Sequence, residues 1–349
     1  MLSFKYITEA LKAEDYEASI VMGFYELTGR PIYDPSKYGI STKIFDSINK
    51  SPVAKEAGIN IARYVLKQYP SLKNKNAEQY GRAKTSITPY WKSHGASNVT
   101  PKTDVLIGDM RFSVKIGLAQ LMSGGKAEST ATFEAAVKNS SKELKKSPQY
   151  DKVVDVLEGF VKNTLAPTQL RPLIKSGTNE VVNKAERAHK EAMKELGALF
   201  EESKSFKIEF AKEAMSGFEK FGKDSLAASE FMLVANSDGS KVSIHSVYDE
   251  NYCLKIANSM RLQARFKTSS RKLKGVKTGE YNFWSVISLI VDSMQDSEEL
   301  QEAKLVNVIR NWVSKTWRNV TSYFKKGISQ LKTFLGLEVE VQVKDKVKF

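Results

Sequence analysis

The apolar positions at the start of the chain recur at helical spacing. Between residues 8 and 27 they keep this spacing until Gly29, Arg30 and Pro31 interrupt it, which predicts one long helix. Ser51 followed by Pro52 predicts the start of another helix, running towards residue 69, because proline fits the first helical turn. The N-terminal part of the chain is therefore predicted to be mainly helical.

The pattern then changes to the two-residue period of strands. Residues 103–107 and 111–115 are short β-type runs on either side of Gly108 and Asp109, which predicts a tight hairpin. Residues 117–125 are expected to leave the strand as a loop or a short helical turn, before a helix at about 129–146. The pair Ser147-Pro148 predicts the start of the next helix.

A charge-rich segment, residues 179–221, predicts helices that bridge two parts of the molecule. Beyond it, apolar runs at 231–235 and 241–247 flank a turn-forming stretch at 236–239, which predicts a second sheet. The remaining predicted elements are a strand at 262–267, a long amphipathic helix at 297–335 and a strand at 337–343.

Together these elements predict an α+β or α/β fold. A chain of 349 residues exceeds the commonest single-domain size, so more than one domain is expected. We expect a core at residues 1–165, a helical bridge at 166–225 and a basic α+β region at 226–349.

The charge of the chain narrows the range of partners. Lysine and arginine number 54 against 40 aspartate and glutamate residues, a net charge of +14. A field of this sign concentrates polyanions, so nucleic acid is the first candidate partner; the alternative is that the charge only keeps the protein soluble. No apolar run approaches the roughly 20 residues that cross a bilayer, and the N-terminus lacks a signal-peptide pattern, so we expect a cytoplasmic protein without a membrane partner.

Cysteine and histidine are too scarce for most metal sites. The single Cys253 excludes an internal disulfide and a cysteine-based zinc site, and the three histidines are widely separated. A bound metal must then be held mainly by carboxylates, which favours Mg²⁺ or Mn²⁺.

The predicted hairpin carries residues suited to phosphodiester hydrolysis. This reaction needs acidic oxygens to hold a divalent metal and a cation to orient water and balance developing charge. Asp104 and Lys115 can supply these groups from adjacent strands, and Ser113 shares a face with Lys115 because it is two residues away. The alternative is an ordinary exposed cross-strand ion pair without catalytic function.

The same segment resembles the PD-(D/E)xK nuclease superfamily, which includes many restriction enzymes, Holliday-junction resolvases and phage exonucleases. In that family an aspartate begins one strand and an acid-x-lysine motif lies on the next. Here Asp104 follows Pro101 at a short distance, and the second motif is Ser113-Val114-Lys115, in which serine replaces the acid. A variant of the family has Ser/Thr-x-Lys followed after twelve residues by a compensating glutamate, and Glu128 is so placed after Lys115.

The resemblance covers about residues 8–137 and implies a restriction-endonuclease-like core, a mixed sheet flanked by helices, that cleaves DNA with Mg²⁺ or Mn²⁺. It implies metal ligands at Asp104, Glu128 and Glu17, the last on the first helix. It also implies catalytic roles for Lys115, Ser113 and Gln120. The lysine-rich, cysteine-poor composition is similar to that of tailed-phage proteins.

Two other classes of function stay open. One is a non-catalytic, phage-like DNA-binding or virion protein that keeps the nuclease fold, and the other is an assembly protein built from the long helices. A second copy of the chain or virion components are then candidate partners.

A basic segment in the second half is the predicted DNA-contacting surface. Residues 255–277 contain no acid, so the segment can follow a phosphate backbone; the alternative is a solvated loop. Its predicted nucleic-acid-binding residues are Arg261, Arg265, Lys267, Arg271, Lys272, Lys274 and Lys277.

Overall fold

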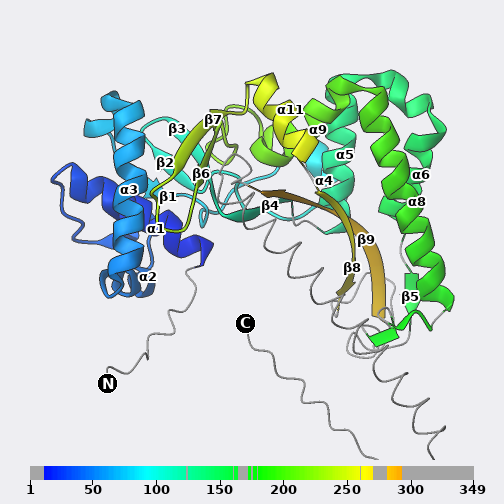
Figure 1. Cartoon of the computed structure of the whole chain (residues 1–349), viewed down its shortest axis with the longest axis horizontal. Coiled ribbons are helices and arrows are strands. Elements are labelled where there is room, and N and C mark those ends of the chain that lie inside the picture. The colour runs from blue at the N-terminus through cyan, green and yellow to red at the C-terminus, as the bar shows by residue number, and fades with distance from the viewer. Residues whose placement is uncertain are drawn as a thin grey trace, which may run out of the picture. The chain divides into compact units, whose positions relative to one another are not determined.

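The computed structural model describes most of the first 292 residues (Figure 1). The described ranges are 12–122, 125–159, 161–163, 172–173, 176–178, 180–259, 261–269 and 281–292. The chain divides into two compact units, Met1–Met294 and Gln295–Phe349. The helix predicted at 297–335 and the strand predicted at 337–343 lie outside the described residues.

Three helices form the N-terminal layer. Helix α1 (Ala13–Leu27) packs on α3 (Pro52–Gln68), with α2 (Thr42–Asn49) beside them. The predicted start of α3 is confirmed, since the Ser51 hydroxyl accepts a hydrogen bond from the amide of Ala54. Helix α1 is also confirmed from Ala13 onward, whereas α2 was not predicted by the apolar spacing.

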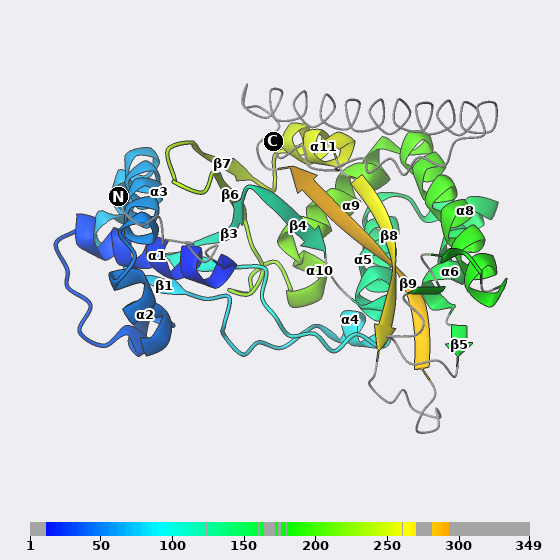
Figure 2. The ribbon, with the colours of Figure 1, turned by 60° about the horizontal axis from the view of Figure 1, so that its bottom comes forward.

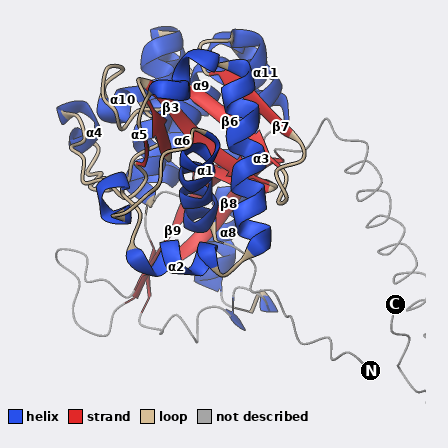
Figure 3. Ribbon diagram, turned by 90° about the vertical axis from the view of Figure 1, so that its left-hand side faces the viewer, coloured by secondary structure: helices blue, strands red, loops and turns tan. Residues whose placement is uncertain are grey.

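A mixed five-stranded sheet lies behind this layer (Figure 3). Its order is β1 (Ala77–Gln79), β2 (Val105–Ile107), β3 (Met110–Ile116), β6 (Phe231–Ala235) and β7 (Val242–Ser246). All neighbouring pairs are antiparallel except β3 and β6, which are parallel. The predicted hairpin is confirmed, with Ile107 opposite Met110 and Gly108 at φ 58° in the turn.

The expectation of a separate second sheet at residues 231–247 is wrong. The whole of β6 pairs along β3, from Phe112 opposite Phe231 to Ile116 opposite Ala235. Leu233 and Ala235 pack on the α1 and α3 side, so the parallel pairing completes a core that the hairpin alone would leave open. The boundaries expected at residues 165 and 225 consequently fall inside the Met1–Met294 unit.

A second group of helices shares its apolar core with Met232 and Val234, which point to the other face of this sheet. Helix α5 (Lys126–Ser140) packs on α9 (Lys204–Ser216), and α6 (Pro148–Glu158) packs on α8 (Glu180–Glu202). The segment expected to bridge two parts instead contributes to this core, since Phe206 and Phe210 are fully buried. Smaller helices are α4 (Pro89–Ser93), α10 (Phe218–Phe221) and α11 (Glu250–Ser259), with short 3-10 turns at Pro35–Tyr38, Pro70–Asn74 and Lys142–Lys146.

A second sheet begins directly after β3 (Figure 2). Strand β9 (Tyr281–Asp292) pairs with β4 (Leu118–Met122), β5 (Val161–Asn163) and β8 (Arg261–Ser269). The loop expected at residues 117–125 is therefore wrong for 118–122: Gly117, at φ 59°, redirects the chain, and Leu121 and Met122 are buried. The strand predicted at 262–267 is confirmed within β8.

We predict that the crossing of α1 and α3 tolerates no side chain at Gly58. A Cβ at Gly58 would collide with the carbonyl of Ser19, and one at Gly23 would lie 2.7 Å from the carbonyl of Gly58. Gly58→Ala should therefore lower the free energy of unfolding by about 2 kcal/mol, as overpacking does. The control is Gly197→Ala in α8, where a Cβ meets nothing within 4 Å and should stabilise by up to about 1 kcal/mol. Chemical denaturation checks both, and an equal effect at the two positions would contradict the packing argument.

Candidate active site

The backbone of Asp104 is held where three strands meet. Its amide donates to the carbonyl of Phe112 at 2.8 Å. Its carbonyl accepts from the amides of Tyr80 at 2.9 Å and Gly81 at 3.1 Å. Asp104 therefore stands at the entry to β2 with β1 on one side and β3 on the other, so its side chain has little freedom of position.

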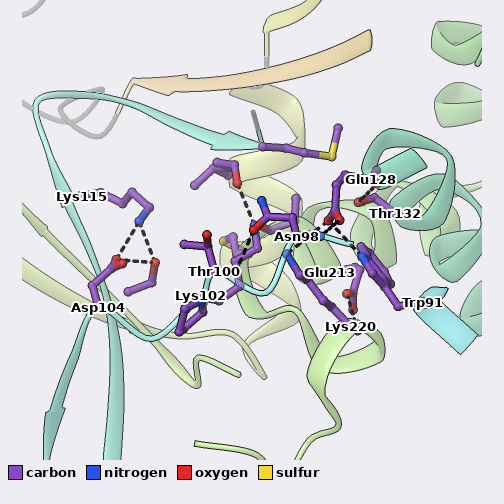
Figure 4. A pocket seen from close by; sticks show the side chains of 16 residues that line it. Trp91, Asn98, Thr100, Lys102, Asp104, Lys115, Glu128, Thr132, Glu213 and Lys220 are labelled. Atoms are coloured by element: carbon purple, nitrogen blue, oxygen red, sulfur yellow. Dashed lines mark hydrogen bonds and ion pairs between the residues drawn. The ribbon is translucent and has the colours of Figure 1, made fainter. Parts of the chain in front are cut away.

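One carboxylate oxygen of Asp104 is surrounded by donors from β3 (Figure 4). Oδ2 accepts from Ser113 Oγ at 3.1 Å, from the Val114 amide at 2.7 Å and from Lys115 Nζ at 3.1 Å. Lys115 Nζ also donates to Ser113 Oγ at 2.7 Å and to the Val114 carbonyl at 2.9 Å. The side chains of Lys115 and Asp104 are only 16% and 17% exposed, so this is not the exposed cross-strand pair that the sequence alone left open.

The carboxyl group of Glu17 reaches the same place from α1. Gln79 Nε2 donates to Glu17 Oε2 at 2.9 Å and so holds the group over the end of β1. A point beside Gly81, where its absent Cβ would stand, lies 3.1 Å from Glu17 Oε2 and 3.5 Å from Asp104 Oδ1. Burial, followed by the charge of Asp104, raises the pKa of Glu17 to about 7.

These oxygens fit the chemistry of a magnesium or manganese ion. Carboxylate oxygens are hard ligands, and Mg²⁺ is commonly held by one or two carboxylates together with waters and substrate phosphate oxygens. Gln79 Oε1, a buried amide oxygen beside Glu17, accepts no hydrogen bond from the described residues. No group of three or more histidine, cysteine, aspartate or glutamate side chains that could hold a metal exists within the described ranges.

Glu128 belongs to a different set of contacts. Its Oε2 accepts from Trp91 Nε1 at 3.0 Å and pairs with Lys220 Nζ at 3.2 Å, while Oε1 accepts from the Asn98 amide at 3.3 Å. Glu128 lines the same pocket as Asp104, but Figure 4 shows the two side chains at separate ends of it. The structure thus brings Glu17, Asp104, Ser113 and Lys115 together and gives Glu128 other partners.

The other predicted residues are placed only in part. Gln120 lies on β4, and its side chain is outside what the structure describes. Arg261, Arg265 and Lys267 lie on β8, again by backbone alone. The predicted contacts at Arg271, Lys272, Lys274 and Lys277 fall outside the described residues.

Three functional candidates were missed from the sequence because they enter the pocket from other segments. Lys102 Nζ donates to the carbonyls of Leu121 at 2.9 Å and Ala214 at 2.6 Å, and burial lowers the pKa of Lys102 to about 7, aided by the charges of Lys220 and Lys115. Burial also raises the pKa of Glu213 to about 7. Only Lys102 had a local signal, its place two residues before Asp104; Glu213 and Lys220, on α9 and α10, had none.

Comparison with protein-family models, curated proteins and solved structures gave no match for this chain. Among the described helices, none has the length and apolar character that a membrane span requires.

We predict that the Glu17 carboxyl destabilises the metal-free protein at neutral and alkaline pH. Its folded-state pKa, about 7, lies above the ordinary 4.5, so between these values the folded chain keeps a proton that the unfolded chain releases. Stability is thus lost as pH rises through this window, by about 3 kcal/mol at most. Glu17→Gln should be more stable than wild type at pH 8 and show a smaller gain at pH 5, as measured by denaturation in a chelator.

The matched control for this measurement is Glu26→Gln on the same helix. Glu26 pairs with Lys55 at the surface, its side chain 48% exposed, so its replacement should change stability little at either pH. A stability difference between Glu17→Gln and wild type that does not change with pH would contradict the assigned pKa.

Proposed function

We propose that this protein is a divalent-metal-dependent DNA phosphodiester hydrolase of the PD-(D/E)xK type. The observation that carries the proposal is the cluster at the end of β1, β2 and β3. There Lys115 and Ser113 bind one oxygen of Asp104, while the other oxygen and Glu17 share the space beside Gly81. An aspartate at the start of one strand beside a Ser-x-Lys on the next is the arrangement that the family resemblance implies.

The fold supports the same proposal. The Asp104 and Lys115 strands are central members of a mixed sheet with helices on both faces, and α1 carries the additional acid. A rigid sheet holds the reactive groups more precisely than a loop, which suits a reaction that depends on positioning. We propose on this basis that the mixed sheet and its helices form a restriction-endonuclease-like core.

Each side chain can be given a chemical role. Glu17 and Asp104 would hold the metal, which supplies Lewis-acid stabilisation of the charge that develops on the phosphate. Lys115 orients the attacking water and balances negative charge, with Ser113 fixing the position of its ammonium group. The net charge of +14 favours DNA as the polyanionic substrate.

A second candidate function is a non-catalytic DNA-binding or virion protein that retains this fold. The observation that favours it concerns Glu128, the acid expected to compensate for the serine at position 113. Glu128 forms an ion pair with Lys220 and accepts a hydrogen bond from Trp91. In that case the cluster at Asp104 would be only a structural brace between strands.

We predict that Asp104→Asn and Lys115→Met each lower Mg²⁺-dependent or Mn²⁺-dependent cleavage of DNA by at least about a hundredfold. The first change removes an anionic ligand and the second the cation at the reacting phosphate. Cleavage of linear, nicked and branched DNA measures the effect, with folding verified by thermal unfolding. Asp109→Asn is the matched control, because Asp109 is exposed in the turn between the same strands.

The control variant should cleave like wild type and lose activity in a chelator. Wild-type protein that cleaves none of these substrates with either metal would favour the non-catalytic function. Equal activity of Lys115→Met and wild type would remove the lysine from the mechanism.

A further inference from the structure

The pocket beside the proposed active site extends well past the reacting groups. Its volume is about 270 Å³, below the 300 Å³ or more that is typical for drug-sized ligands and enough for a group no larger than about one nucleotide. Asp104 and Lys115 line one end, and Glu128 and Lys220 line the other (Figure 4). Lys102 also lines this pocket.

The acids of this pocket already have donors. Asp104 is bound by β3, as described above. Glu128 forms an ion pair with the ammonium group of Lys220 and accepts a hydrogen bond from the indole N–H of Trp91. Glu213 accepts from the backbone amides of Glu219 at 2.9 Å and Lys220 at 3.2 Å. Each of these carboxylates thus has a partner other than Lys102 among the described residues.

Lys102 has no ion pair within the described part of this pocket, and Glu213 and Glu128 act on its charge only at longer range. Its ammonium group donates to the carbonyls of Leu121 and Ala214, which are neutral. Within the part of the chain that the structure describes, no carboxylate forms an ion pair with it, and the pocket acids Asp104 and Glu128 pair with Lys115 and Lys220. An ammonium has three hydrogens, so one stays available for an acceptor in the pocket. A buried ammonium group whose hydrogen bonds go only to neutral carbonyls is costly, and an anion in the pocket would offset that cost.

We infer that the pocket is a subsite for a second phosphate of the nucleic-acid substrate, bound by Lys102 with support from Lys220. This inference rests on the proposed function for the identity of the substrate. Charge-assisted hydrogen bonds from lysine are a common means of holding phosphate oxygens. The phosphate belongs either to a strand end or to the internal backbone next to the bond that is cleaved.

Binding measured without metal tests the subsite independently of cleavage. The probes are single-stranded oligonucleotides of one sequence with a 5′-phosphate, a 3′-phosphate or hydroxyl ends, and a covalently closed single-stranded circle, all in chelator. The variants are Lys102→Met and Lys102→Gln, of which the second keeps donors for the carbonyls of Leu121 and Ala214 without the charge. Lys43→Met, an exposed position on α2, is the control.

Both Lys102 variants should bind about tenfold or more weakly than wild type. Their salt dependence should be flatter by about 0.7 in log Kd per log salt, the value for one phosphate contact on a single strand, whereas Lys43→Met should resemble wild type. A wild-type preference for one phosphorylated end that is lost in the variants would assign the pocket to a strand terminus. Equal weakening on all four probes would assign it to an internal phosphate.

Wild-type affinity and salt slope in Lys102→Gln would overturn the subsite. So would an absence of DNA binding by wild-type protein in chelator. These results are distinct from a failure of the proposed function. A protein that cleaves DNA through Asp104 but is unaffected at Lys102 loses only the subsite, and one that binds through Lys102 without cleaving loses only the catalytic proposal.

Discussion

The arrangement of the site depends on the bonding of one carboxylate oxygen. Asp104 Oδ2 accepts three hydrogen bonds from residues 113–115 on the neighbouring strand. Such a carboxylate cannot rotate without losing several charge-assisted bonds, so its second oxygen is directed towards Gly81 and Glu17. The same contacts fix the separation of β2 and β3 at the point where helix α1 crosses the end of β1.

Local signals in the sequence were sufficient to predict the helix and strands that carry the residues of this site. The turn at Gly108 and the alternation on either side predicted the hairpin, and the two-residue period placed Ser113 beside Lys115. Capping chemistry predicted the starts of α3 and α6, where Ser51 and Ser147 each accept from an amide three residues on. Glu17 was expected from resemblance alone, and the structure places it beside Asp104.

The features that were not predicted depend on pairing between distant parts of the chain. Strand β6 lies more than a hundred residues after its partner β3. Parallel strands are not joined by a short turn, so no turn sequence indicates that they pair. Strand β4 was expected to be a loop, and its partner β9 is still more remote in the sequence. Glu128 contacts Trp91 and Lys220, which are distant from it in the sequence, so no local spacing predicts these contacts.

The pocket and the Glu17 carboxyl near it depart from the ordinary rule that buried charges are paired. Most buried charges in folded proteins are paired, yet Lys102 is held by carbonyls, and burial brings the pKa values of Glu17 and Glu213 to about 7. These groups cost stability in a protein that elsewhere packs Phe24, Phe112 and Phe133 completely. Local conflicts of this kind persist in natural proteins chiefly at functional sites, where the ligand supplies the missing partner. Under the proposed function, a divalent cation held by Glu17 and Asp104 and a phosphate bound by Lys102 would each supply a partner of opposite sign.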